Sequence, residues 1–262
     1  MKQYQNKLII AVLISASLLT TSCEDIWNRC VDGNGDRRIE TRALQEFTRI
    51  EINGEFEVQI DTELDHAAVI EADENLIDLI VTHVSGSTLI IETRNGTCIR
   101  PSRPVEITVS TEFLDEISLN GSGYAYCYSL ETEDLSAKLA GSGQIDLNNA
   151  VAATIDIELE GSGMINCTSV SENISATLEG SGEIGLEGSS VSSEFRIIGS
   201  GKIKARELNT DVCVAYISGS GITDTWVNNA LDVTIIGSGI VYYTGNPVVE
   251  SYISGSGEVR ER

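Results

Sequence analysis

From residue 113 onward, apolar side chains occupy every second position on both sides of a recurring Gly-Ser-Gly tripeptide. Such alternation is typical of β-strands with one buried face. The position two residues before the tripeptide is always Leu or Ile: Leu119, Leu139, Leu159, Leu178, Ile197, Ile217, Ile235 and Ile253. The intervening positions are mixed polar and charged, as expected for an outward face. Helices are disfavoured because the hydrophobic period is two and a glycine pair interrupts each unit.

The tripeptide occurs eight times at intervals of 18 to 20 residues. Its first glycines are Gly121, Gly141, Gly161, Gly180, Gly199, Gly219, Gly237 and Gly255. One short unit cannot form a core alone, but units stacked in identical register can. We therefore predict an all-β fold: a right-handed parallel β-helix or solenoid with Gly-Ser-Gly turns every 18–20 residues, in which coils pair at ~4.8 Å. A β-propeller and a meander of hairpins are the rival folds.

The preceding segment, 46–112, has the same alternation with less regularity. Ile50, Ile52, Phe56, Val58 and Ile60 alternate with polar residues around a single glycine. We predict an irregular β segment that caps the N-terminal end of the regular solenoid, 113–262, so that 46–262 is one continuous domain.

The beginning of the chain has the pattern of a lipoprotein signal peptide over residues 1–22. Two lysines precede a short apolar run, and Leu18-Leu19-Thr20-Thr21-Ser22-Cys23 resembles a bacterial lipobox. Lipidation of Cys23 would leave residues 23–45 as a lipidated tether. The predicted location is the cell envelope, as an outer-membrane lipoprotein. Acidic Glu24 and Asp25 resemble a surface-export signal, and the sequence leaves open which leaflet the protein is attached to.

The segment Phe47-Thr48-Arg49-Ile50-Glu51-Ile52-Asn53-Gly54-Glu55-Phe56-Glu57-Val58, followed by Gly-Ser-Gly coils, resembles the bacterial family of auto-transporter adhesin head GIN domains. The resemblance covers residues 46–262. It implies a right-handed β-helical, toastrack-like fold and an extracytoplasmic address among lipoproteins of Bacteroidetes. The family supplies no catalytic motif to transfer.

Five cysteines follow Cys23. Cys30 and Cys98 lie outside the repeat in polar segments, and in an oxidising envelope they are expected to form a disulfide. Cys127, Cys167 and Cys213 fall on inward positions and should be free structural thiols. The cysteines lack C-x-x-C spacing and the two histidines lie elsewhere, so neither a metal site nor a cofactor is predicted.

The formal net charge is -23, which opposes binding to nucleic acid. The same charge opposes binding to anionic lipid, so the membrane is predicted to be a partner only through the lipid anchor. The remaining candidate partners are glycan or protein ligands. Tyr124, Tyr126 and Tyr128 alternate with inward residues, so they either face a ligand or pack under the N-terminal segment. The loop Asp32-Gly33-Asn34-Gly35-Asp36 lacks the Gly and Glu that complete a calcium-binding EF-hand, which favours a flexible tether.

These patterns favour a non-enzymatic cell-envelope lipoprotein, an adhesin-like or structural binding module that presents a solenoid surface. No catalytic residue is predicted. One alternative is a carbohydrate-active β-helix that uses surface carboxylates such as Glu158 with Glu160, or Glu160 with Glu179. The other is an envelope scaffold that self-assembles through the solenoid ends.

Overall fold

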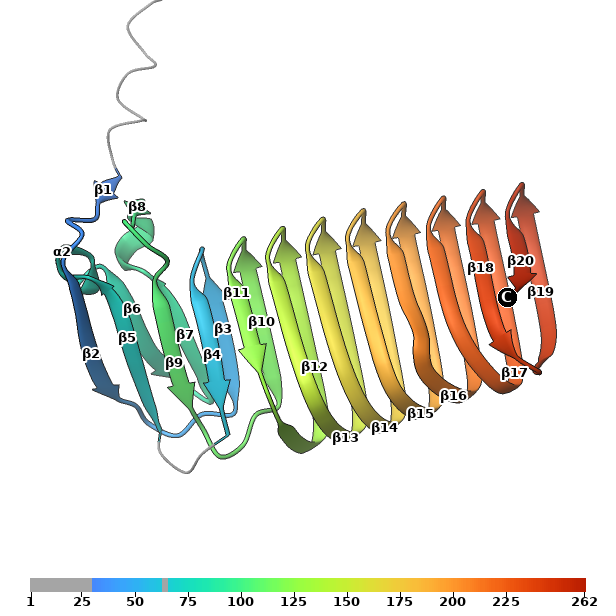
Figure 1. The fold of residues 1–262 in the computed structure, drawn as a ribbon, viewed down its shortest axis with the longest axis horizontal. Coiled ribbons are helices and arrows are strands. Elements are labelled where there is room, and N and C mark those ends of the chain that lie inside the picture. The colour runs from blue at the N-terminus through green and yellow to red at the C-terminus, as the bar shows by residue number, and fades with distance from the viewer. Residues whose placement is uncertain (1–29, 63–65) are drawn as a thin grey trace, which may run out of the picture.

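The computed structural model describes residues 30–62 and 66–262. The predicted signal peptide and Cys23 lie outside these residues. The regular part contains strands β10 (Glu116–Gly121), β11 (Tyr124–Cys127), β12 (Leu130–Gly141), β13 (Gln144–Gly161), β14 (Met164–Gly180), β15 (Glu183–Gly199), β16 (Lys202–Gly219), β17 (Ile222–Gly237), β18 (Ile240–Gly245), β19 (Val248–Gly255) and β20 (Glu258–Glu261). They form a row of parallel coils whose Gly-Ser-Gly corners align along one edge of the molecule (Figure 1).

Successive coils stack in the register that the repeat predicts. Leu139 lies opposite Leu119 on one side and Leu159 on the other, and the same row continues to Ile253. From Leu119 to Ile235 its members are buried, whereas Ile253 at the last coil is 39% exposed. The predicted parallel β-solenoid is thus confirmed, and parallel pairing between consecutive units excludes both the propeller and the hairpin meander.

The corners require glycine for two separate reasons. Gly161 has φ +120°, a backbone region that L side chains rarely adopt, and a Cβ there would lie 2.4 Å from the carbonyl oxygen of Gly141. A Cβ on Gly163 would lie 2.7 Å from Cδ2 of Leu139. Each corner therefore packs directly on the one before it, and the backbone N–H of Ser162 donates to the Gly141 carbonyl at 3.0 Å.

The N-terminal region contains β1 (Val31–Asp32), β2 (Arg37–Ala43), β3 (Arg49–Asn53), β4 (Glu57–Asp61), β5 (Ala67–Asp73), α2 (Glu74–Ile77), β6 (Ile80–Ser85), β7 (Thr88–Thr93), a 3-10 turn η1 (Arg94–Gly96), β8 (Ile99–Arg100) and β9 (Glu106–Ser110). β3 and β4 form a further coil beside β10 and β11, with a corner at Gly54. β7 and β9 pair in parallel with that coil.

Antiparallel strands close this end of the rod. β5 pairs antiparallel with β9 and β2, and β6 pairs antiparallel with β7. β2 forms the outermost strand, seen in dark blue at one end of Figure 1. Residues 23–45 are predicted from the sequence to be a tether, but residues 37–43 form strand β2. The backbone of this charged, weakly apolar segment forms the strand because it pairs with the otherwise open edge of β5.

No helix within the described ranges is long and apolar enough to cross a membrane.

Candidate functional site

Tyr124 and Tyr126 stand on the outward face of β11, beside the N-terminal coils, and Tyr128 directly follows this strand. Tyr124 and Tyr126 are half-buried, stacked with their ring centroids 6.4 Å apart, whereas Tyr128 is 64% exposed. In register they neighbour Glu57 and Gln59 of β4. The rings of Tyr124 and Tyr126 therefore lie on the outer surface of the sheet, beside the outward side chains of β4. Of the three tyrosines, only Tyr128 is exposed to solvent.

A polar network fixes Tyr124. Its hydroxyl donates to Asp146 Oδ2 at 2.8 Å, and the same carboxylate accepts from the amides of Gln144 and Asn166, each at 2.8 Å. Burial, followed by the hydrogen bond to Asp146 and its negative charge, raises the pKa of Tyr124 to about 12. Outward side chains of three consecutive coils are thereby locked into one ordered surface.

The corners line a shallow hollow of about 490 Å³ along the edge of the rod. Its floor is backbone glycine, and its rims carry exposed serines at the strand spacing, including Ser122, Ser142, Ser162 and Ser181. Gln144, Met164 and Glu183 close one side. This surface offers serine hydroxyl groups to a long ligand, because the backbone N–H groups of the corners already donate to the preceding coil.

The carboxylates considered for glycosidase chemistry lie on the open surface. Glu160 and Glu179 are neighbours in register on β13 and β14, and Glu158 lies opposite Thr177. All three acids are exposed. A retaining glycosidase needs two carboxyl groups ~5 Å apart. Register neighbours can approach that spacing, but here they stand on a flat sheet without walls.

The cysteines divide as the sequence suggests. Cys30 and Cys98 form a disulfide with their Cα atoms 4.3 Å apart, next to the paired strands β1 and β8. The other three described cysteines, Cys127, Cys167 and Cys213, are free and buried. Burial raises the pKa of each of these thiols to about 11, which keeps the reactive thiolate scarce at neutral pH.

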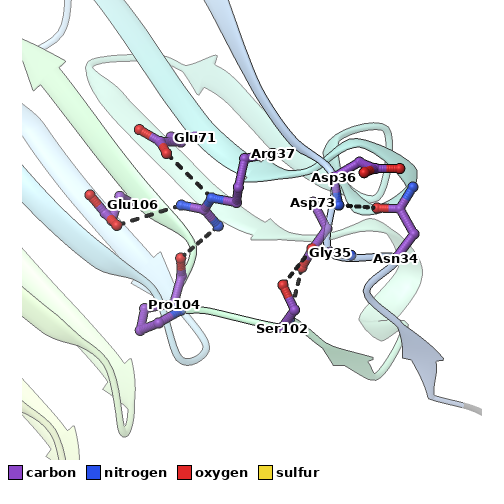
Figure 2. Close-up of polar contacts among 9 residues, drawn as sticks. All are labelled: Asn34, Gly35, Asp36, Arg37, Glu71, Asp73, Ser102, Pro104 and Glu106. Carbon is purple, nitrogen blue, oxygen red and sulfur yellow. Dashed lines mark hydrogen bonds and ion pairs between the residues drawn. The ribbon is translucent and has the colours of Figure 1, made fainter.

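A buried acid that the sequence did not single out anchors the N-terminal loop. The Asp73 carboxylate accepts from the backbone N–H of Gly35 and from the N–H and hydroxyl of Ser102, at 2.8, 2.8 and 2.6 Å (Figure 2). Burial by itself raises the pKa of Asp73, but these hydrogen bonds and the Arg37 charge outweigh it and hold the pKa below its usual value. The prediction of a flexible tether at residues 32–36 is therefore wrong: the hydrogen bond from Gly35 to Asp73, at the end of β5, holds this loop in place, and we call the arrangement the Asp73 staple.

Arg37 forms the second half of this staple. Its guanidinium lies 3.3 Å from Glu71 and 3.5 Å from Glu106, and donates to the carbonyl of Pro104 at 3.0 Å (Figure 2). The contacts join three segments that are distant in sequence. Their role is architectural, since they fasten the outermost strand, β2, to β5 and β9.

Taken together, the fold and its surfaces define a class of protein: a capped parallel β-solenoid that offers open, ordered faces. The chain belongs to the family described as "Putative auto-transporter adhesin, head GIN domain", whose model matches residues 46–247.

Solved structures have the same fold. A protein from Parabacteroides distasonis described as a "putative lipid binding protein" is 27% identical, with a TM-score of 0.84, covering 88% of this chain and 99% of that one. A "putative adhesin" from Parabacteroides merdae is 20% identical with a TM-score of 0.85, covering 89% and 99%. No protein with a curated function matches this sequence.

Proposed function

We propose that this chain is a non-enzymatic, adhesin-like lipoprotein of the cell envelope, which contacts a glycan or protein through the outward face of its solenoid. The observation that carries the proposal is the continuous face of in-register coils, on which side chains such as Tyr124 are immobilised by the Asp146 network. Ordered outward side chains lose little entropy on binding, and aromatic rings can stack on sugars or anchor a protein. Family membership supports the same class of function.

The experiment is a glycan and protein array probed with the full chain, followed by adhesion of cells that display it. We expect that the ligands bound by the wild type on the array no longer bind the triple variant Tyr124→Ser, Tyr126→Ser, Tyr128→Ser. Exposed Val170 and Val191 on distant coils provide matched controls, each replaced by Ser. Equal adhesion by cells with and without the protein would contradict the proposal.

The membrane attachment in this proposal rests on Cys23. Metabolic labelling with palmitate should mark the wild-type chain and not Cys23→Ser, and the variant should be released from the outer-membrane fraction. Labelling that persists in the variant would remove the anchor from the proposal.

Lipid binding is a second candidate, favoured by one hollow. A cavity of about 500 Å³ lies between the disulfide and the Gly54 corner, with Phe56, Ile99 and Val105 on its wall. The test is binding of a fluorescent fatty acid. This function is favoured over adhesion if unlabelled fatty acid displaces the probe from the wild type and if the Ile99→Glu variant does not bind the probe.

Turnover of a polysaccharide that Glu160→Gln abolishes would instead establish the enzymatic alternative. Concentration-dependent sedimentation would favour the scaffold.

A further inference from the structure

The basic residues of the solenoid are concentrated at a single place. Between Lys138 and Arg260 the sequence has only four Lys or Arg residues, namely Arg196, Lys202, Lys204 and Arg206. All four flank the corner between β15 and β16. In a chain of net charge -23, this spacing creates a local patch that can attract an anion.

Two of these cations have neither an ion pair nor an aromatic partner within residues 30–62 and 66–262. Lys204 pairs with Glu183 at 2.6 Å, and Arg196 stacks on the ring of Tyr216 at 4.4 Å. In contrast, neither Lys202 nor Arg206 forms an ion pair with any residue in 30–62 or 66–262. Both side chains are exposed and therefore available to a ligand.

Arg206 lines a hollow of about 510 Å³, and Lys202 neighbours another of its lining residues, Glu183, in register. The hollow opens because one row of outward side chains is interrupted: Tyr126, Asp146, Asn166, Gly185, Lys204, Asp224 and Tyr242 follow one another in register. Gly185 contributes no side chain, so the sheet is dented at this coil. Lys204 and Arg206 stand on the wall of the dent.

A β-bulge shapes the same wall. Gly185 pairs with Lys204, but Glu187 pairs with Glu207, so β16 has one extra residue over this interval. Against β17 the mismatch is larger, because Ala205 pairs with Thr225 and Asn209 with Trp226. Bulges redirect side chains and are frequent beside binding sites. Here the bulged segment contains Arg206.

The rest of the lining supplies groups that recognise hydroxyls. Asn148, Asn166 and Thr168 offer amides and a hydroxyl, and Glu187 and Glu207 offer carboxylates. The other two acids of the lining are already matched, Glu183 by Lys204 and Asp224 by Arg262 at 3.1 Å. Such a mixture fits a sugar ring, whose hydroxyls both donate and accept, better than an apolar ligand.

We propose that the hollow at Gly185 is a binding site for an acidic saccharide, with Arg206 and Lys202 holding its carboxylate or sulfate and the amides holding its ring hydroxyls. Glu187 and Glu207 belong to the same lining, so the proposal places them against the ring hydroxyls and away from the anionic group. Salt at physiological strength screens acids that lie farther away than ~8 Å. The inference rests on the proposed adhesin-like function. It adds a ligand class and a second contact site, three coils from Tyr126 on the same outward row.

Isothermal titration calorimetry of the full chain tests the site with three probes: an oligogalacturonate, a galactose-6-sulfate oligosaccharide and a neutral galacto-oligosaccharide. We expect one of the acidic probes to bind, which distinguishes carboxylate from sulfate, and the neutral probe to bind at least tenfold more weakly. Equal affinity for the neutral probe, or no binding of either acidic probe, would overturn the proposal.

Two variants locate the binding. Gly185→Tyr should fill the dent, because its φ is not positive and the same outward row carries Tyr126 and Tyr242. The nearest atom to an added Cβ is the side-chain amide oxygen of Asn166 at 2.7 Å, which must turn aside. Arg206→Gln removes one free cation. Both should weaken acidic-probe binding at least tenfold, whereas the control Lys138→Gln, on a distant coil, should leave it unchanged.

Circular dichroism and melting temperature show that each variant is folded. Acidic-saccharide binding that survives both Gly185→Tyr and Arg206→Gln would overturn the site and leave the adhesin-like function standing. If every ligand found on the array is a protein, the proposed saccharide site is likewise excluded, and the adhesin-like function still stands. Failure of the wild type to retain any array ligand would instead count against the proposed function itself.

Discussion

The cap, residues 30–112, and the regular solenoid, 113–262, solve the same problem in different ways. Every solenoid coil repeats one packing arrangement, with Leu or Ile over Leu or Ile and glycine over glycine. The cap must end that repetition, and it does so with antiparallel strands, a disulfide and the buried Asp73 staple. Repetition distributes stability over many equivalent contacts, whereas termination depends on a few specific ones.

The strongest way to break the comparison is a charge in the middle of the solenoid core. Leu159→Asp places an unpaired carboxylate where the side chain is 1% exposed, and we expect a loss of ~3–5 kcal/mol. Urea denaturation followed by circular dichroism measures it. Glu160→Gln, one residue away and exposed, should shift stability by no more than ~0.5 kcal/mol. An unchanged midpoint for Leu159→Asp is incompatible with the inward assignment.

Removing the disulfide should weaken the cap and spare the coils. The bond joins residues 68 positions apart, and loss of a native disulfide commonly costs ~2–5 kcal/mol. In the double variant Cys30→Ser, Cys98→Ser we expect faster amide hydrogen exchange near β1 and β8 and unchanged protection in β13 to β16. Dithiothreitol should reproduce this in the wild type and add nothing in the variant. Uniform deprotection along the rod would show that the cap and coils unfold as one unit.

A corner variant tests the solenoid's dependence on close stacking. Gly161→Ala puts a Cβ against the Gly141 carbonyl at φ +120°, and backbone strain alone should cost ~1–3 kcal/mol. Ser162→Ala, at the exposed middle position of the same corner, is the matched control and should be nearly neutral. Equal melting temperatures for the two variants would mean that the corner tolerates side chains.

The Asp73 staple makes the cap sensitive to acid. Its pKa is lower folded than the unfolded value of 3.8, so its stabilisation is complete above that value and is lost as pH falls through the folded pKa. Asp73→Asn should destabilise the cap by ~1–3 kcal/mol at neutral pH and flatten its stability profile below pH 3.8. Hydrogen exchange of β2 against pH gives the measurement. If the stability of the cap falls equally with acid in the wild type and in Asp73→Asn, the Asp73 staple is not the cause of the acid sensitivity.

The two regions also differ in how far their structures can be predicted from sequence. The solenoid can be predicted from the sequence because each inward position, such as Leu159, is repeated in the next unit at a nearly constant interval. Asp73 lies in an acidic run, Glu71-Ala72-Asp73-Glu74, and nothing local distinguishes this buried acid from half-buried Glu71 and exposed Glu74. Likewise β2 resembles a tether because one of its edges faces solvent and few of its side chains are buried.

The same contrast applies to the candidate site. The outward placement of Tyr124 follows from alternation alone, but its partner Asp146 lies one coil away and is found only once the register is known. Gly185 could have been noticed as a glycine outside the corners. Its neighbours Lys204 and Arg206 acquire meaning only when β15 is laid on β16, because the bulge shifts their register.

The smallest effect is expected at the first regular coil, where the two regions meet. Tyr124→Phe removes the hydroxyl that donates to Asp146 and should cost ~0.5–1.5 kcal/mol. Because the pKa of Tyr124 is raised from 10.0 to about 12, its stabilisation is complete below pH 10.0 and is lost as pH rises towards 12. The wild type should therefore lose more stability than Tyr124→Phe between these pH values, measured by urea denaturation. Tyr128→Phe, at an exposed ring, should follow the wild-type profile. If Tyr124→Phe follows it too, the phenol does not couple the first coil to its neighbours, and the ordered surface must depend on the amides of Gln144 and Asn166 alone.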